Sequence, residues 1–581
     1  METLADLGSL AQASSAIWEQ NYNPFDNIFI SALVAAVPII FFFVCLVGFK
    51  LKGYSAAFLS VVLASLVAVF AYDMPILKVL YSLLYGVLFG LYPIGWIIIA
   101  AIFLYKLTVK SGYFDILRES IITITPDMRL QVILIAFCFG AFLEGTIGFG
   151  GPVAITAALL VGMGIKPIQA AGLCLIANLP PATFGAVGIP VTALANLVQV
   201  DALKISTMSA IMLAPFSFCI PFLLVFLLSG FKGVRESAPA CFVAGFSFIS
   251  AKIITASFFG PELPDITAGI VSITALGAFL KVWKPKNIML AENKSVQGVD
   301  SKIAQDSLDS KVLIESLNAP KPRTISVKQT LLSGAPFGIL IFIIVIWTQD
   351  WFNALFASGG ALEFLTLKFN FKELSEIYQV APIVAESKAV KSLFEIPLIN
   401  SVGSAIFLAA LCTAMILKIK PKVALSAFSE TFKEMYLAVV TICLVLAFAY
   451  VSNYSGISAT LALALSKTGE SFIFFSPIVG WLGVVLTGSV TSSNVLFGSL
   501  QQLTAGQLGI NEVLLLSANA IGGATGKMIS LQSIAVAASV VGLVGKEAQV
   551  LGYTLKYSLI LALGSGVACL ITAFAFPFIV P

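Results

Sequence analysis

Four short, polar, glycine-rich segments interrupt hydrophobic stretches of this 581-residue chain, at 144–152 and 178–185 in the first half and at 487–494 and 519–527 in the second. Glycine lets the backbone turn and brings its N–H groups close to a ligand. Serine, threonine and asparagine add hydrogen-bond donors, and the N-terminus of a short helix adds a partial positive charge. The segments therefore predict a site for a small anion such as a carboxylate, held without a fixed cationic clamp.

The residues that we expect to contact the anion come from all four segments. The alternative interpretation is that they only pack helices, because Gly, Ser and Thr are common at contacts between membrane helices. One such segment would leave the two interpretations equal, whereas four in symmetrical positions favour binding. The predicted binding residues are Gly145, Thr146, Gly148, Gly150, Asn178, Thr491, Ser492, Ser493, Asn494, Asn519, Gly523 and Lys527.

Two carboxyl groups are candidates for carrying a proton. Glu144 lies at the tip of the first segment, where burial of a carboxyl group favours its protonated form; its alternative role is to accept backbone N–H bonds at the turn. Glu386 lies in a stretch that is hard to place, and its alternative role is an interfacial pair with Lys388. Lys527 is predicted either to attract an anionic substrate or pair with Glu144, or to be a helix-end lysine whose charge reaches water.

The hydrophobic stretches around these segments define the class of protein. The chain is 59% hydrophobic and 11% charged, against about 25% charged in a typical soluble domain. Apolar runs of about 20 residues recur, and each is long enough to cross a bilayer. We therefore expect an all-α polytopic membrane protein in contact with the lipid bilayer. The net charge of +4 does not favour a nucleic-acid partner.

Histidine is absent from the chain, which excludes a histidine proton relay, a histidine metal site and a Ser-His triad. The eight cysteines lie in apolar runs without a C-x-x-C pair, as expected for small hydrophobic side chains. We expect no metal, no cofactor and no enzyme activity, because the sequence offers no nucleophile–base pair or carboxylate cluster. A channel would not need interrupted helices around a central site.

Charges at the ends of the apolar runs predict how the chain crosses the membrane, because Lys and Arg favour the cytoplasmic side. Residues 1–27 are acidic, lack the basic start of a cleavable signal peptide and are predicted to be periplasmic. A cytoplasmic linker, 284–326, separates a first transmembrane half, 28–283, from a second, 327–581. The placement of 352–400 stays open, and 76–104 is either one tilted helix or a pair broken around Pro93.

Each half is predicted to contain a re-entrant hairpin followed by a broken helix. The hairpin at 131–166 enters from the cytoplasm, on arms of about 11 to 13 residues that are too short to span the bilayer, and the hairpin at 471–505 enters from the opposite side. The broken helices are interrupted at 178–185 and at 519–527. Two such units in opposite orientation are typical of the inverted repeats of secondary transporters.

Several long motifs resemble those of the bacterial L-lactate permease family. They are GAFLEGTIGFGGPVAITAALL at 140–160, FGPELPD at 259–265, LFASGGA at 355–361, SNYSG at 452–456, TGKMIS at 525–530 and WEQNYNP at 18–24. The likeness covers nearly the whole chain apart from its start and the linker. One departure concerns coupling, because Val490 stands where the family pattern has Asp. The proton carrier is then Glu144 or Glu386, or the coupling differs in this member.

The resemblance implies a fold and a function. The function is proton-coupled uptake of L-lactate, with D-lactate and glycolate as related 2-hydroxy acid anions, across the bacterial cytoplasmic (inner) membrane. A sodium-coupled carboxylate transporter is the alternative. The fold is similar to inverted-repeat ion transporters in which a hairpin domain moves as an elevator. The oligomeric state stays open between a monomer and a homodimer.

Overall fold

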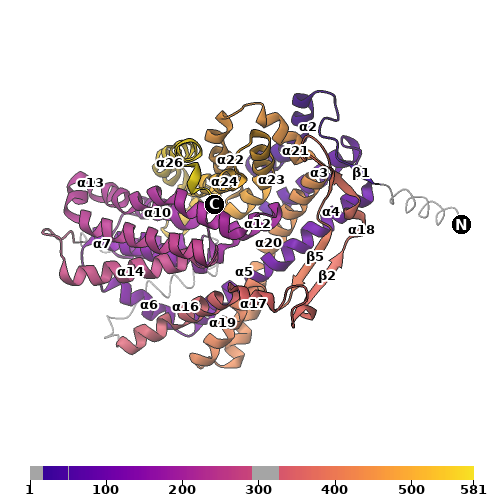
Figure 1. The fold of residues 1–581 in the computed structure, drawn as a ribbon. Coiled ribbons are helices and arrows are strands. Elements are labelled where there is room, and N and C mark those ends of the chain that lie inside the picture. Colours follow the sequence, from indigo (N-terminus) through magenta and orange to yellow (C-terminus); the bar gives the residue numbers. More distant parts are fainter. Residues whose placement is uncertain (1–16, 50, 149, 291–325) are drawn as a thin grey trace.

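The computed structural model describes residues 17–49, 51–148, 150–290 and 326–581, most of which are helical (Figure 1). Within these residues, nine helices are long and apolar enough to cross a membrane. The predicted multi-pass helical membrane protein is therefore confirmed. Most of the predicted periplasmic segment and of the predicted linker lies outside the described residues.

Helices from both halves of the chain combine into a first body, which we call the frame. Its helices are α2 (Ile28–Phe43), α3 (Gly53–Phe70), α4 (Ile76–Phe89), α5 (Trp96–Lys110), α6 (Tyr113–Ile122), α16 (Val327–Trp347), α19 (Val402–Ile416), α20 (Pro421–Tyr454) and α21 (Ile457–Ser466). In the frame, α4 packs on α20 and α5 on α19, and the backbones approach closely where Gly86 meets Ala447. Non-helical dihedrals at Tyr92, within the π-helical η2 (Gly90–Gly95), make 76–110 a broken pair.

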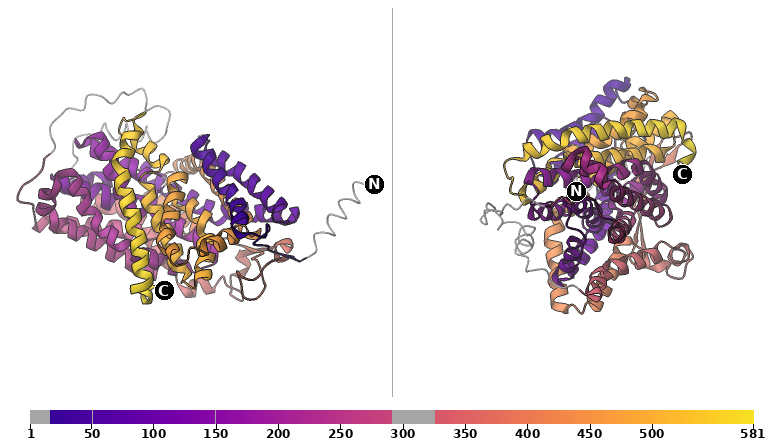
Figure 2. Two further views of the ribbon diagram at one scale, coloured as in Figure 1. Left: turned by 90° about the horizontal axis from the view of Figure 1, so that it is seen from above. Right: turned by 90° about the vertical axis from the view of Figure 1, so that its left-hand side faces the viewer.

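The second body, which we call the site body, carries all four polar segments. Its helices are α7 (Met128–Val132), α8 (Gly140–Thr146), α9 (Gly151–Gly162), α10 (Pro167–Ala177), α11 (Leu179–Ala182), α12 (Ile189–Val198), α13 (Ala202–Phe258), α14 (Pro264–Val282), α22 (Ser471–Thr487), α23 (Val490–Leu508), α24 (Glu512–Lys527), α25 (Leu531–Val540) and α26 (Glu547–Ala575). The 57-residue α13 folds back at Gly230, and Gly245 packs against Phe218. Figure 2 shows α26, in yellow, lying along one side of this body.

The first hairpin joins a long arm to a shorter one. The long arm runs from α7 through the π-helical η3 (Ile133–Phe139) into α8, so its 19 residues exceed the 11 to 13 expected, and all of them are buried. The chain then turns through Gly148 and Gly150, both with positive φ, a conformation that glycine adopts without strain. The second arm, α9, begins directly after this turn, so Glu144 lies in the last turn of the first arm.

The first broken helix is interrupted where the sequence predicts it. Helix α10 ends before Asn178, and Pro180 and Pro181 lie in the single turn of α11. Gly185, Val187 and Gly188 then take positive φ before α12 begins. Proline removes a backbone donor and glycine accepts left-handed geometry, so the helix stops and restarts here.

The second hairpin is made by α22 and α23 around a two-residue turn. Gly488, with φ of 77°, ends α22 in the left-handed conformation common after helix C-termini. The Ser489 hydroxyl oxygen then accepts a hydrogen bond from the Ser492 N–H at 3.2 Å and caps α23. Thr491 and the residues up to Asn494 are therefore the first turn of a helix rather than part of a loop.

The prediction for the second broken helix is wrong in position. Residues 519–527 are part of the continuous helix α24, and the interruption lies at 528–530, before α25. The glycines of this segment do not break the helix; they let it pack closely on α22. A Cβ on Gly522 would overlap the carbonyl oxygen of Pro477, and one on Gly526 would lie 2.5 Å from that of Trp481.

The all-α expectation is also corrected, because part of 352–400 forms two small sheets. The strands are β1 (Trp18–Glu19), β2 (Thr366–Asn370), β3 (Ile377–Gln379), β4 (Lys388–Ala389) and β5 (Leu393–Pro397), accompanied by the short helices α17 (Asp350–Ala354) and α18 (Lys372–Ser375). β1 pairs in parallel with β3, β3 is antiparallel to β4, and β2 is antiparallel to β5. The strands gather at one end of the frame (Figure 1), where the alternation of short polar and apolar runs gave only an ambiguous signal.

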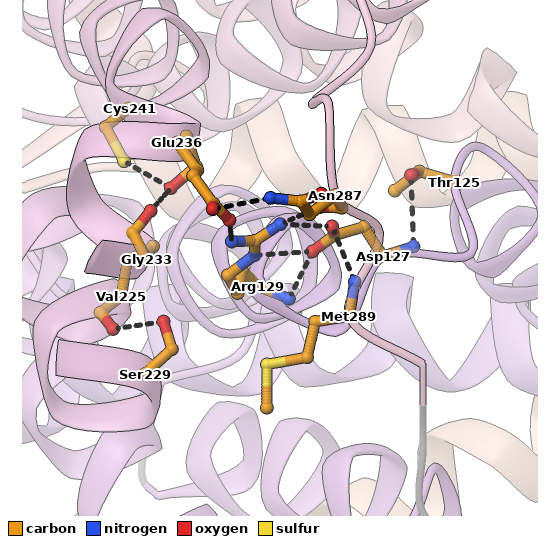
Figure 3. A network of polar contacts seen from close by, with 11 residues as sticks. Thr125, Asp127, Arg129, Val225, Ser229, Gly233, Glu236, Cys241, Asn287 and Met289 are labelled. Atoms are coloured by element: carbon orange, nitrogen blue, oxygen red, sulfur yellow. Dashed lines mark hydrogen bonds and ion pairs between the residues drawn. The ribbon is translucent and has the colours of Figure 1, made fainter.

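A polar network fixes the base of the arm that carries Glu144 (Figure 3). Arg129 donates to Asp127 Oδ2 at 2.8 Å, to Glu236 Oε2 at 2.6 Å and to the carbonyl oxygen of Asn287 at 2.5 Å. Asp127 also accepts a hydrogen bond from the Met289 N–H at 3.1 Å. The network thus joins the first hairpin to the turn of α13 and to the chain that follows α14.

Arg129→Ala is expected to destabilise the fold by about 3–5 kcal/mol, because it leaves the Asp127 carboxylate buried without its partner. Burial alone would raise the pKa of Asp127, but hydrogen bonds from Arg129 and Met289 lower it below its usual value. The stabilisation is therefore present above the ordinary aspartate pKa and is lost as pH falls through the lowered value. Thermal unfolding of the purified protein in detergent measures both effects.

Lys110→Ala is the matched control, because Lys110 pairs with Glu430 at 2.6 Å where both side chains are partly exposed. An exposed pair contributes about 0–1 kcal/mol. Equal losses of stability in the two variants would contradict the role given to Arg129.

Candidate functional site

A cavity of about 60 Å³ lies where the turns of both hairpins meet the first helix break. One water molecule needs about 10–15 Å³ by the same measure, so the cavity admits a small molecule. Its lining comes from four places in the chain. The residues are Glu144, Gly150, Ala182, Gly185, Ala186, Ile189, Pro190, Gly488, Ser489, Val490, Thr491, Lys527, Gln532, Ser533 and Val536.

Four helices begin at this cavity. Gly150 precedes α9, Ile189 opens α12, Val490 opens α23, and Ser533 lies in the first turn of α25. Each helix N-terminus carries a partial positive charge of roughly half an elementary charge. These N-termini offer backbone N–H groups to an anion, whereas the C-terminal ends of α8, α11, α22 and α24 bring partial negative charge to the same lining.

A buried ion pair joins the two halves of the chain across the cavity. Lys527 Nζ donates to Glu144 Oε1, and only 1% of the Glu144 side chain and 11% of the Lys527 side chain are exposed. Glu144 Oε2 has no hydrogen-bond partner in the described part of the chain. The structure therefore shows Lys527 paired with Glu144, which is one of the three roles predicted for this lysine.

Of the predicted site residues, the structure brings Glu144, Gly150, Thr491 and Lys527 to the cavity lining. Gly145 instead packs on Asp265, since a Cβ there would lie 2.9 Å from the Asp265 Cβ. Glu386 is exposed in the strand region and does not line the cavity. The others that lie outside the lining are Thr146, Gly148, Asn178, Ser492, Ser493, Asn494, Asn519 and Gly523.

Several of these residues lie outside the lining and hold together the helices that form it. Asn494 Nδ2 donates to the carbonyl oxygen of Pro190 at 3.1 Å, and Asn519 Nδ2 donates to Asn494 Oδ1 at 3.0 Å. Gln501 Nε2 completes the chain by donating to Asn519 Oδ1 at 3.2 Å. The amides thus tie α12, α23 and α24 together and hold two of the helix N-termini at the cavity.

Three of the remaining predicted residues, Ser493, Thr146 and Gly523, have packing roles. The hydroxyl of Ser493 donates to the Gly480 carbonyl at 3.1 Å, and that of Thr146 to the carbonyls of its own helix. Gly523 faces Val484, where a Cβ would lie 2.9 Å from a methyl group. At these three positions the contacts agree with the alternative interpretation from the sequence, in which the residues pack helices.

Sequence reasoning missed a second buried ion pair beside the cavity. Lys252 Nζ donates to Asp265 Oδ1 at 2.6 Å and to the Pro180 carbonyl at 2.5 Å, and both side chains are buried. The pair holds the first helix break against α13 and α14. A lysine inside the apolar run of α13 was the available signal, because ionisable residues within membrane helices rarely lack a role.

Three lining residues were also missed. Ser489, Gln532 and Ser533 place polar groups at the starts of α23 and α25. Ser530 and Ser533 fit a helix-start pattern, since the Ser533 N–H donates to the Ser530 hydroxyl oxygen at 3.3 Å. Recognising that pattern would have moved the predicted break to its true place.

Taken together, the apolar helices and the central cavity define a multi-pass membrane protein with a small polar cavity between its two hairpins. Comparison with known proteins identifies the family to which the chain belongs. The L-lactate permease family profile matches residues 31–576. The chain belongs to the L-lactate permease family, a family of transport proteins.

Curated relatives match along almost the full length. Glycolate permease GlcA of Escherichia coli K12 is 48% identical over 96% of this chain and 98% of its own. The L-lactate permease of the same organism is 45% identical over 97% of this chain and 100% of its own, and that of Bacillus subtilis is 43% identical over 96% and 98%.

Solved structures show a more distant likeness. The YdaH transporter of Alcanivorax borkumensis is 15% identical, with a TM-score of 0.45, over 86% of this chain and 90% of its own. MtrF of Neisseria gonorrhoeae is 13% identical, with a TM-score of 0.44, over 87% and 86%.

Gly522→Ala is expected to destabilise the protein by about 1–3 kcal/mol, because the added methyl group forces α22 and α24 apart. The same separation displaces Lys527 at the end of α24, so transport falls with stability. Thermal unfolding and transport assays on the same preparation measure the two effects.

Gly552→Ala is the control, because Gly552 lies in α26 with open space around it. Replacing an unconstrained helical glycine by alanine stabilises by about 0.5–1 kcal/mol. A Gly522→Ala protein as stable as the parent would refute the close packing of α22 on α24.

Proposed function

We propose that the protein is a secondary active transporter that carries L-lactate, D-lactate or glycolate together with a proton across the bacterial cytoplasmic membrane. The relatives named for glycolate and L-lactate support a small 2-hydroxymonocarboxylate as substrate. The observation that carries the coupling is the buried Glu144–Lys527 pair in the cavity where four helices begin.

The substrate carboxylate competes with Glu144 for Lys527. An anion in the cavity finds four helix N-termini and the ammonium group, but it also meets the carboxylate already paired with that group. Two carboxylates sharing one buried ammonium repel each other, and one of them is destabilised. Binding of the substrate anion therefore requires that Glu144 lose its negative charge.

A proton taken up by Glu144 satisfies this requirement. Once displaced from Lys527, the buried carboxylate has lost its cationic partner, and a buried charge without a partner costs several kcal/mol unless a proton neutralises it. Its Oε2 atom, which has no partner in the described residues, is free to carry the proton. The loaded site then holds one added anion and one added proton, so its net charge is unchanged when it crosses the membrane.

The rest of the cavity fits the remainder of a 2-hydroxy acid. Ser489, Thr491, Gln532 and Ser533 offer hydroxyl and amide groups for the substrate hydroxyl. Val490 packs with Ala182, Val484 and Ala524 in a small apolar cluster beside the cavity, and this wall suits a hydrogen or a methyl group on the substrate. Val490 also means that no second carboxylate stands at the start of α23, which leaves Glu144 as the acidic group of the lining.

We infer that transport moves the site body relative to the frame. In support, both hairpins and both broken helices belong to the site body, whereas α3, α4, α5, α19 and α20 pack with one another. Interrupted helices are tolerated in a membrane only where protein or a cavity covers them, as in inverted-repeat transporters. A rigid body that carries the whole cavity past the frame is the elevator movement implied by the family resemblance.

Glu144→Gln is expected to abolish accumulation of lactate driven by a pH gradient in reconstituted vesicles, because glutamine cannot take up the proton. Exchange of labelled for unlabelled lactate should persist, because the neutral amide resembles the protonated carboxyl. Accumulation at the level of the unaltered protein, with the same need for a pH gradient, would contradict the assignment.

Two controls sharpen this experiment. Glu386→Gln removes an exposed carboxyl outside the cavity, and this variant should accumulate lactate normally. Replacing Na⁺ by choline at fixed pH should leave uptake unchanged. A loss of uptake in choline would instead favour sodium coupling.

Lys527→Gln is expected to raise the KM for lactate by about 10- to 100-fold, in both accumulation and exchange. The reason is the loss of a charge-assisted hydrogen bond to the substrate, a contact that contributes about 1.5–3 kcal/mol. Radiolabelled lactate uptake at a series of concentrations gives the value. An unchanged KM for exchange would show that Lys527 does not hold the substrate.

A further inference from the structure

A second, larger cavity of about 520 Å³ lies between the site body and the strand region. Its lining includes the ends of α12 and α20, the second half of α23 and the chain around β3 and β4. It is distinct from the central cavity, with which it shares no residue. The proposed function leaves it without a role.

The two cavities lie at opposite ends of one helix pair. Asn494 donates to the Pro190 carbonyl at 3.1 Å, and eight residues further along both helices Gln502 donates to the Val198 carbonyl at 2.9 Å. Helices α12 and α23 therefore run parallel, side by side. At 1.5 Å per residue, the second cavity lies about 14 to 18 Å from the central one.

The second cavity presents cationic and neutral donors. Lys388 and Lys391 both line it and are exposed, and Lys391 Nζ donates to Gln199 Oε1 at 2.8 Å. Glu512 is the acidic residue of the lining, and its carboxylate already accepts a hydrogen bond from Gln502 at 2.8 Å. Two lysines against one carboxylate leave the lining with a net positive charge.

Several of these donors lack a partner. In the described part of the chain, no hydrogen bond or ion pair involves the ammonium group of Lys388 or the side-chain amide of Asn453. The buried Tyr450 also lines the cavity, and its hydroxyl has no hydrogen bond within the described residues. The cavity is larger than one small hydroxylated carboxylate, so such a ligand would share it with water, and the unpaired donors suit its carboxylate and hydroxyl groups.

We propose that this cavity is a second, weaker binding site for the same small 2-hydroxycarboxylates, which the substrate occupies before it reaches the central site. The inference rests on the proposed function. Lys388 binds the substrate carboxylate, with Lys391 beside it, and Asn453 and Tyr450 contact its hydroxyl. The second cavity lies between the site body and the strand region. The substrate therefore enters it only from the face of the protein that carries the strands.

The test is the double variant Lys388→Gln/Lys391→Gln, with Lys372→Gln as control, since Lys372 is an exposed lysine of α18 outside the lining. For lactate added on the strand face of oriented vesicles, the double variant should raise the KM about 3- to 10-fold with kcat unchanged. High salt should reduce the difference, because it screens exposed charges. For lactate added on the opposite face, the KM should not change.

A measurement of equilibrium binding distinguishes a binding site for lactate from a general electrostatic attraction of anions to the lysines. Purified Lys527→Gln protein, whose central site is weakened, should still bind lactate by calorimetry, and adding the two glutamine substitutions should remove that binding. The proposal is overturned if the KM is unchanged, if it rises equally on both faces, or if it rises without any loss of residual binding. Absence of lactate uptake by the unaltered protein would instead overturn the proposed function.

Discussion

The ion pair between Glu144 and Lys527 is the interaction on which the rest of the structure depends. The two residues are 383 positions apart and come from different halves of the chain, yet they meet at the centre of the site body. A charge buried without a partner costs several kcal/mol, so neither group can be left unpaired in this place. In the proposed mechanism, an anion that displaces one partner must therefore bind together with a proton, and this requirement couples substrate binding to proton uptake.

The surrounding architecture serves to place that pair among four helix N-termini. The amide chain through Asn494 and Asn519 fixes α12 and α23, and the close packing of α22 on α24 sets the end of the helix that carries Lys527. At its other end, the arm that carries Glu144 is anchored by Arg129. The second ion pair, Lys252 with Asp265, holds the first helix break in position. Polar groups far from the cavity thus determine its shape.

The sequence predicted the membrane class, the two hairpins and the first broken helix because glycine, proline and charge interrupt long apolar runs unmistakably there. It misplaced the second break because Gly522, Gly523 and Gly526 signal both chain reversal and close helix packing, and only the neighbouring helix α22 distinguishes the two. Glu144 and Lys527 were predictable as intramembrane charges. Their pairing was only one option, since contacts between distant segments leave no local pattern. The strand region was missed because its strands are two to five residues long.

Proton binding measured together with substrate binding tests the central claim most directly. Purified protein in weakly buffered detergent solution would be titrated with L-lactate at neutral pH, with a pH-indicator dye reporting proton uptake and calorimetry reporting occupancy. The displacement of Glu144 from Lys527 predicts about one proton taken up for each lactate bound. Lactate binding at the same affinity without proton uptake would contradict it.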